Sequence, residues 1–75
     1  MVDQKLALAV ARADLAVREH PELRVGQALW NALMAEMPEA VYDLAGSELD
    51  CFYEDRKVFA TIHAMLWRTR RESDL

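Results

Sequence analysis

The residues best suited to nucleophilic chemistry in this 75-residue chain are a single cysteine, Cys51, and two histidines, His20 and His63. A cysteine that meets a histidine and an aspartate in space could act as a thiol nucleophile. Cys51, however, stands between Asp50 and Asp55, and neighbouring negative charge raises a thiol pKa and disfavours the reactive thiolate. The alternative is a buried, unreactive cysteine, which is how free cysteines usually occur. We therefore expect no catalytic residues and no enzymatic activity.

A metal site would need the same cysteine and histidines to converge with a carboxylate. The spacings that mark such sites, CxxC, HxxxH and HExxH, do not occur in the sequence. His20 is better explained as a residue at a helix end, and His63 as a residue that packs on Trp67. The sequence therefore predicts neither a metal ligand nor a bound cofactor.

The composition predicts one folded domain over residues 1–75. The apolar fraction is 53 %, slightly above the soluble average of about 45–50 %. The net charge is −4, from 9 basic and 13 acidic residues, which argues against a nucleic-acid partner. One cysteine cannot form an internal disulfide, and residues 1–20 are too often interrupted by charge for a signal peptide or a membrane span. We expect a cytoplasmic protein without membrane association.

The elements that must position these residues are helices. Ala, Leu, Glu, Arg and Met dominate, and no alternating strand pattern occurs. Pro21, Pro38 and Gly46 divide the chain, and Asp3 and Asp55 are suited to cap helix starts. We expect an all-α fold, a small bundle of three main helices plus one short helix. The predicted helices cover residues 3–18, 22–37, 38–45 and 56–71, followed by a tail at 72–75.

The apolar periodicity predicts which helix faces form the core. The predicted core faces are Leu6, Val10, Ala13 and Val17 in the first helix, Val25, Ala28, Leu29, Ala32 and Leu33 in the second, and Val58, Ile62, Met65 and Thr69, broadened by Phe59 and Leu66, in the last. Gly26 is unfavourable inside a helix, by about 1 kcal/mol relative to Ala, so we expect another backbone to approach it closely.

The stretch "LDCFYEDRK", residues 49–57, is here called the latch segment. We expect Phe52 and Cys51 to dock onto the second helix, and Phe52→Ala to cost about 3–5 kcal/mol. Asp50 or Tyr53 would bond to Arg24, Gln27 or Asn31. The predicted structural residues of the latch are Arg24, Gln27, Asn31, Asp50, Phe52 and Tyr53.

Two surfaces could bind a partner. Leu8 and Leu15 form a second apolar row on the first helix, and His63 and Trp67 lie one turn apart on the last. Both rows could equally be core. The stretch "WRTRR" adds Arg70 and Arg71, which could contact phosphate or compensate the helix dipole.

The helix "LRVGQALWNAL" and the following "ELDCFYEDRKV" together resemble a pattern in small proteins of bacteriophages and prophages. The pattern is R-x-G-Q-x-x-x-N-A-L followed by D-x-F-Y and an acidic helix start. The matching positions are Arg24, Gly26, Gln27, Asn31, Ala32 and Leu33, then Asp50, Phe52, Tyr53 and Asp55. The resemblance covers about half of the chain and implies a phage-related setting in a bacterial host cell, without indicating an activity.

The leading hypothesis is a non-enzymatic protein of phage or prophage type that binds a host or phage protein as an inhibitor or accessory regulator. A homodimer is compatible with the surplus apolar residues. The alternative is a small DNA-binding transcriptional regulator that uses the arginine-rich end of the last helix. The sequence alone does not identify the partner, the oligomeric state, the pathway or the exposure of Trp67, Leu8 and Leu15.

Overall fold

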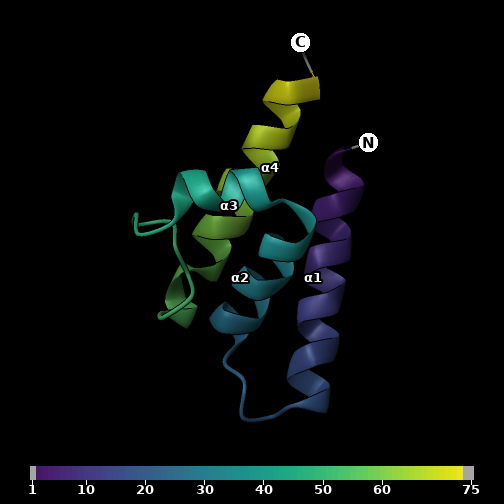
Figure 1. Ribbon diagram of the computed structural model, residues 1–75, viewed down its shortest axis with the longest axis vertical. Helices are drawn as coiled ribbons and strands as arrows, with labels where there is room; N and C mark the ends of the chain where they lie inside the picture. Colours follow the sequence, from purple (N-terminus) through teal and green to yellow (C-terminus); the bar gives the residue numbers. More distant parts are fainter. Residues whose placement is uncertain (1, 74–75) are drawn as a thin grey trace.

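The computed structural model describes the backbone of residues 2–73 and the side chains of residues 4–70, and this part of the chain is an all-α bundle (Figure 1). Its helices are α1 (Val2–Glu19), α2 (Val25–Glu36), α3 (Pro38–Leu44) and α4 (Val58–Ser73), with a 3-10 turn, η1 (Asp55–Lys57), directly before α4. The predicted fold class is therefore confirmed, and no strand occurs among the described residues.

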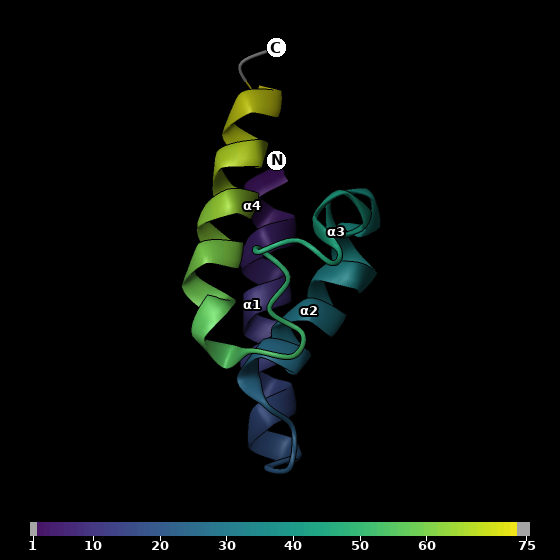
Figure 2. The same cartoon turned by 90° about the vertical axis from the view of Figure 1, so that its left-hand side faces the viewer.

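The three long helices pack side by side, and α3 crosses the end of α2 (Figures 1 and 2). The chain runs down α1, returns up α2, and runs up again in α4. The molecule measures 40 × 24 × 17 Å along its principal axes. Its core consists of buried residues from every helix: Leu6, Ala9, Ala13, Ala28, Leu29, Trp30, Leu33, Met37, Ala40, Val41, Cys51 and Met65.

The helix boundaries follow from backbone chemistry. The second helix begins at Val25 rather than at residue 22, because Arg24 is extended (φ −78°, ψ 149°) and the Leu23 N–H donates to the His20 carbonyl in a turn. It ends at Glu36 because Pro38 disfavours the α conformation at Met37. The last helix continues to Ser73, past the predicted end at residue 71.

Gly46 follows the end of α3 with φ 78°, the left-handed conformation that favours glycine. The predicted role of Gly46 as the residue that ends the third helix is therefore confirmed. Asp3 lies inside α1 rather than before it, and its side chain is outside the described residues.

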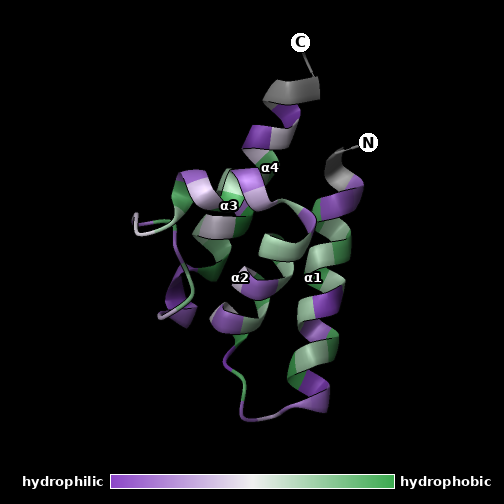
Figure 3. Cartoon of the chain, viewed as in Figure 1, coloured by the Kyte–Doolittle hydropathy of each residue, from purple (hydrophilic) through white to green (hydrophobic). Residues whose placement is uncertain are grey.

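The predicted core faces are right for the centre of the bundle and wrong at one side of it. Leu6, Ala13, Leu33, Met65 and Thr69 are buried as expected. Val10, Val25, Phe59 and Leu66 are instead exposed, since none of the described elements covers them. Figure 3 shows that hydrophobic residues recur along α1 between polar turns, so one core does not use all of its apolar surface.

Candidate functional site

The latch segment docks on the first turn of α2 through Gly26. The Cys51 side chain is fully buried, and its thiol donates to the Gly26 carbonyl over 3.3 Å. A Cβ atom at Gly26 would collide with the Cys51 carbonyl oxygen and lie 2.9 Å from the Asp55 carboxylate. The expected close backbone approach at Gly26 is therefore confirmed, and its partner is the backbone of Cys51.

The side chains of Asp55 and Arg24 add hydrogen bonds and an ion pair to the contact between the latch segment and α2. The Asp55 Oδ1 atom accepts the Gly26 N–H at 2.9 Å and lies 3.6 Å from the Arg24 guanidinium. Arg24 also donates to the Phe52 carbonyl at 2.7 Å. Asp55 therefore satisfies a free N–H at the start of α2, and the prediction that it caps the last helix is wrong.

The other predicted latch residues make different contacts from those expected. Asp50 accepts the N–H groups of Gly46 and Phe52, so it orders its own turn rather than reaching α2. Phe52 is half-buried, and its ring meets the exposed Tyr53 ring edge-on, with centroids 4.7 Å apart. Asn31 is exposed and Gln27 is half-buried, and neither shares a hydrogen bond with the side chains of Asp50 or Tyr53.

Thr61 is a latch residue that the sequence analysis missed. Its side chain is fully buried in the second turn of α4. Its hydroxyl lies 2.6 Å from the Leu49 carbonyl and 2.9 Å from the Lys57 carbonyl. The hydroxyl thus joins the beginning of the latch segment to α4. The signal in the sequence was a threonine beside the apolar residue Ile62, on the side of the helix that also carries Val58 and Met65.

The thiol of Cys51 is placed for packing rather than for nucleophilic attack. Burial raises the pKa of Cys51 above its usual value, and a hydrogen bond with Thr61 offsets part of this rise. The charges of Asp50 and Asp55 raise the pKa further but contribute less than burial does. His63 is exposed on α4, and His20 is exposed 3.5 Å from Glu22, so the described thiol contacts involve no imidazole.

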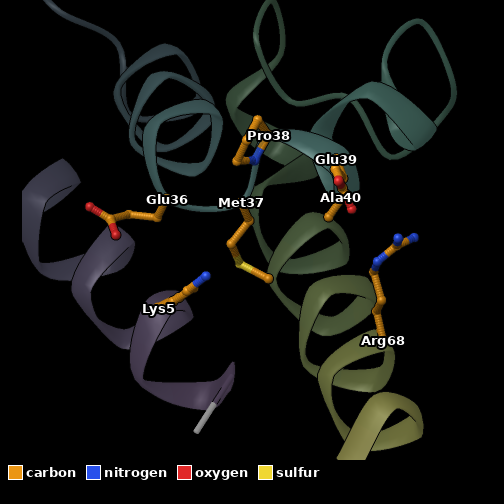
Figure 4. Close-up of a pocket in the computed structure, with 7 residues that line it drawn as sticks. All are labelled: Lys5, Glu36, Met37, Pro38, Glu39, Ala40 and Arg68. Carbon is orange, nitrogen blue, oxygen red and sulfur yellow. The ribbon is translucent and has the colours of Figure 1, made fainter.

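A polar cavity of about 320 Å³ lies where the start of α3 passes α1 and α4 (Figure 4). Lys5 and Arg68 extend toward residues 37–40 from opposite sides, with the Met37 side chain between them. Arg68 donates to Asp43 at 2.7 Å, and Glu36 pairs with Arg12 at 3.1 Å. Two of the charged residues around this cavity, Glu36 and Arg68, therefore serve ion pairs that hold helices together.

No cluster of three or more metal-ligating side chains occurs among the residues that the structure describes. Within the same part of the chain, no helix is long and apolar enough to cross a membrane.

The two predicted partner-binding rows are both exposed. Leu8 and Leu15 are 43 % and 53 % exposed, on the side of α1 opposite the buried Ala9 and Ala13. Trp67 is 59 % exposed on α4. His63 and Arg70 are exposed on the same side of α4, and we call His63, Trp67 and Arg70 the α4 row. The side chain of the predicted Arg71 lies outside the described residues.

A second apolar surface, the α1–α4 groove, was not predicted. It is a cavity of about 240 Å³ open to solvent, lined by Val10, Ala13, Asp14, Val17, Val25, Leu29, Val58 and Ile62. Of the residues assigned to the core, Ala13 and Leu29 are buried as expected, whereas Val10 and Val25 are exposed and Val17, Val58 and Ile62 are half-buried.

Comparisons of this chain with models of protein families, with curated proteins and with solved structures return no significant match. The geometry of these surfaces is therefore the basis for a functional assignment.

Proposed function

We propose that this protein is a non-enzymatic binding protein of phage or prophage type, which docks on a host or phage protein in the bacterial cytoplasm as an inhibitor or accessory regulator. The observation that supports the proposal is the exposed α4 row. A tryptophan that is 59 % exposed, flanked one turn away by His63 and accompanied by Arg70, presents apolar area and charge together. Such an arrangement is typical of a helix that binds a groove on another protein.

The α4 row is a better partner surface than Leu8 and Leu15 on α1. Binding hot spots are enriched in tryptophan and arginine, whereas leucine is under-represented among them. A half-exposed tryptophan gains much buried area on binding at a small entropic cost. We therefore assign the docking contact to α4 and use α1 as the internal control.

DNA binding by the end of α4 receives less support. Arg68 is engaged with Asp43, so the ion pair with α3 competes with a phosphate for this guanidinium. The acidic excess of the whole chain also opposes the approach of a phosphate backbone. Arg70 then acts as a rim charge of the protein-binding row.

The test compares immobilised wild-type protein with Trp67→Ala and Leu15→Ala in lysates of phage-infected and uninfected bacteria. Both substituted side chains are exposed, so both variants should keep the wild-type unfolding midpoint. We expect wild type and Leu15→Ala to retain the same stoichiometric partner and Trp67→Ala to bind it at least ~30-fold more weakly. Equal retention by Trp67→Ala, or no retained partner with wild type, would overturn the proposal.

A further inference from the structure

The α1–α4 groove has the size of a site for side chains rather than for a small molecule. Its volume of about 240 Å³ lies below the range of roughly 300–1,000 Å³ that is usual for small-molecule sites. Seven of its eight lining residues are apolar, and the eighth, Asp14, is paired with Arg18 at 3.1 Å. The groove therefore fits an apolar side chain from another polypeptide.

Two apolar stripes border this groove. On α4, Phe59, Ile62 and Leu66 recur at i, i+3 and i+7 and so share one face of the helix. On α1, Val10 and Val17 are two turns apart and both line the groove. Two neighbouring helices with exposed apolar stripes form half of a four-helix bundle.

Phe59 is the most exposed large hydrophobic residue described, at 85 %. It directly follows Val58 and lies one turn from Ile62, both of which line the groove. The molecule therefore presents a projecting ring and an apolar groove next to each other. A two-fold symmetric interface requires this arrangement, because each copy must offer both halves of the contact.

We propose that a second copy of this chain occupies the α1–α4 groove, in a two-fold dimer in which Phe59 of each copy enters the groove of the other. α1 and α4 of the two copies together form a four-helix bundle. On α4 the dimer contact is centred on Phe59, Ile62 and Leu66. Trp67 lies about 80° further round the helix than Phe59, and His63 and Arg70 lie between the two, so the two proposed contacts adjoin on α4 with Trp67 farthest from the groove.

Surface area and charge both fit a second copy. The solvent-accessible surface area of the chain is 5184 Å². A compact monomer of 8.6 kDa has roughly 4,700 Å², about a tenth less. A stable interface covers about 800 Å² per partner, which a 40 Å long face of this molecule can supply. The Asp14–Arg18 pair balances the charge beside the groove, which limits repulsion between two copies at this face.

The test is the molar mass of the full chain by sedimentation equilibrium, from about 1 to 500 μM, for wild type, Phe59→Glu and Leu15→Glu. Both substitutions add one negative charge at an exposed position, but Leu15 lies on the outer side of α1, opposite the buried Ala9 and Ala13. We expect a concentration-dependent dimer for wild type and Leu15→Glu, and a dissociation constant at least ~30-fold higher for Phe59→Glu.

The dimer proposal is contradicted if the wild-type chain stays monomeric to 500 μM, or if Phe59→Glu leaves the dimer intact. A monomer that binds a foreign amphipathic helix in the groove would also overturn it, because the occupant would then be a different partner. The docking proposal has a separate variant and readout, the loss of the lysate partner on Trp67→Ala, so failure of one proposal is distinguishable from failure of the other.

Discussion

The latch segment and the α1–α4 groove lie on two sides of the same small bundle and are built in opposite ways. The latch segment is held by directional contacts of Arg24, Gly26, Asp55 and Thr61, and its own Cys51 side chain is fully buried. The groove is apolar and open. The difference follows from the backbone: irregular segments need partners for their N–H and C=O groups, whereas helices satisfy their own and can leave an apolar face uncovered.

The contact at Gly26 is the most sensitive point of the latch side. We expect Gly26→Ala to lower the free energy of unfolding by about 3 kcal/mol, because the added Cβ collides with the Cys51 carbonyl and crowds the Asp55 carboxylate. The usual gain of about 1 kcal/mol from placing Ala in a helix is too small to offset this overlap. Chemical denaturation followed by circular dichroism measures the change.

Gly46→Ala is the matched control for Gly26→Ala. No atom lies within 4 Å of a Cβ at Gly46, but its φ of 78° disfavours alanine. The expected loss is about 1–2 kcal/mol, the usual cost of a left-handed conformation. If Gly26→Ala proves no more harmful than Gly46→Ala, the latch segment does not pack tightly on α2, and the contrast with the groove fails.

Thr61→Val tests whether the latch depends on polar contacts rather than on volume. The variant keeps the shape of the side chain but removes the hydroxyl that lies 2.6 Å from the Leu49 carbonyl. A buried polar group left without a partner costs about 1–3 kcal/mol, so we expect a loss of about 2 kcal/mol. Thr61→Ser retains the hydroxyl and should recover most of that stability. A larger loss for Thr61→Ser than for Thr61→Val would assign the role of Thr61 to its methyl group.

Arg24→Ala should have a smaller effect, of about 1 kcal/mol. The guanidinium donates to the Phe52 carbonyl and lies 3.6 Å from Asp55, but it is partly exposed to water. Arg18→Ala, which removes only the exposed pair with Asp14, should cost no more than about 0.5 kcal/mol. Differential scanning calorimetry at two salt concentrations separates the two, since the exposed pair is screened more strongly.

Residue periodicity and backbone chemistry made much of this structure predictable. The helices follow from apolar spacing, and their ends follow from Pro38 and from the left-handed Gly46. Gly26 was informative because a glycine inside a helix has a local cost that only a tertiary contact explains. These inferences share one property: each depends on a few residues that are close together in the sequence.

The incorrect inferences depend on what lies across the bundle. Periodicity places Val25 and Phe59 on or beside apolar faces, but it does not reveal whether another helix covers those faces. Phe52 packs against the core as expected, but it is only half-buried, and the fully buried residue of the latch segment is its neighbour Cys51. Residues 51–54 form a turn in which the Glu54 N–H donates to the Cys51 carbonyl, and in this turn Cys51 is buried while Phe52 stays at the edge of the core.

Substitution of Phe59 tests most directly whether the side of the bundle that carries the α1–α4 groove is open to solvent. Its side chain is 85 % exposed, so Phe59→Ser should change the stability of the monomer by no more than about 0.5 kcal/mol. The measurement is thermal unfolding of wild type and variant at about 1 and 500 μM protein.

Dimerisation makes the unfolding temperature depend on concentration, because association stabilises only the folded chain. We therefore expect the two proteins to unfold at nearly the same temperature at 1 μM, and wild type alone to become more stable at 500 μM. A loss of several kcal/mol at 1 μM would instead place Phe59 in the core of the monomer. The groove would then be a packed part of the bundle, and the two sides of the molecule would not differ as the structure indicates.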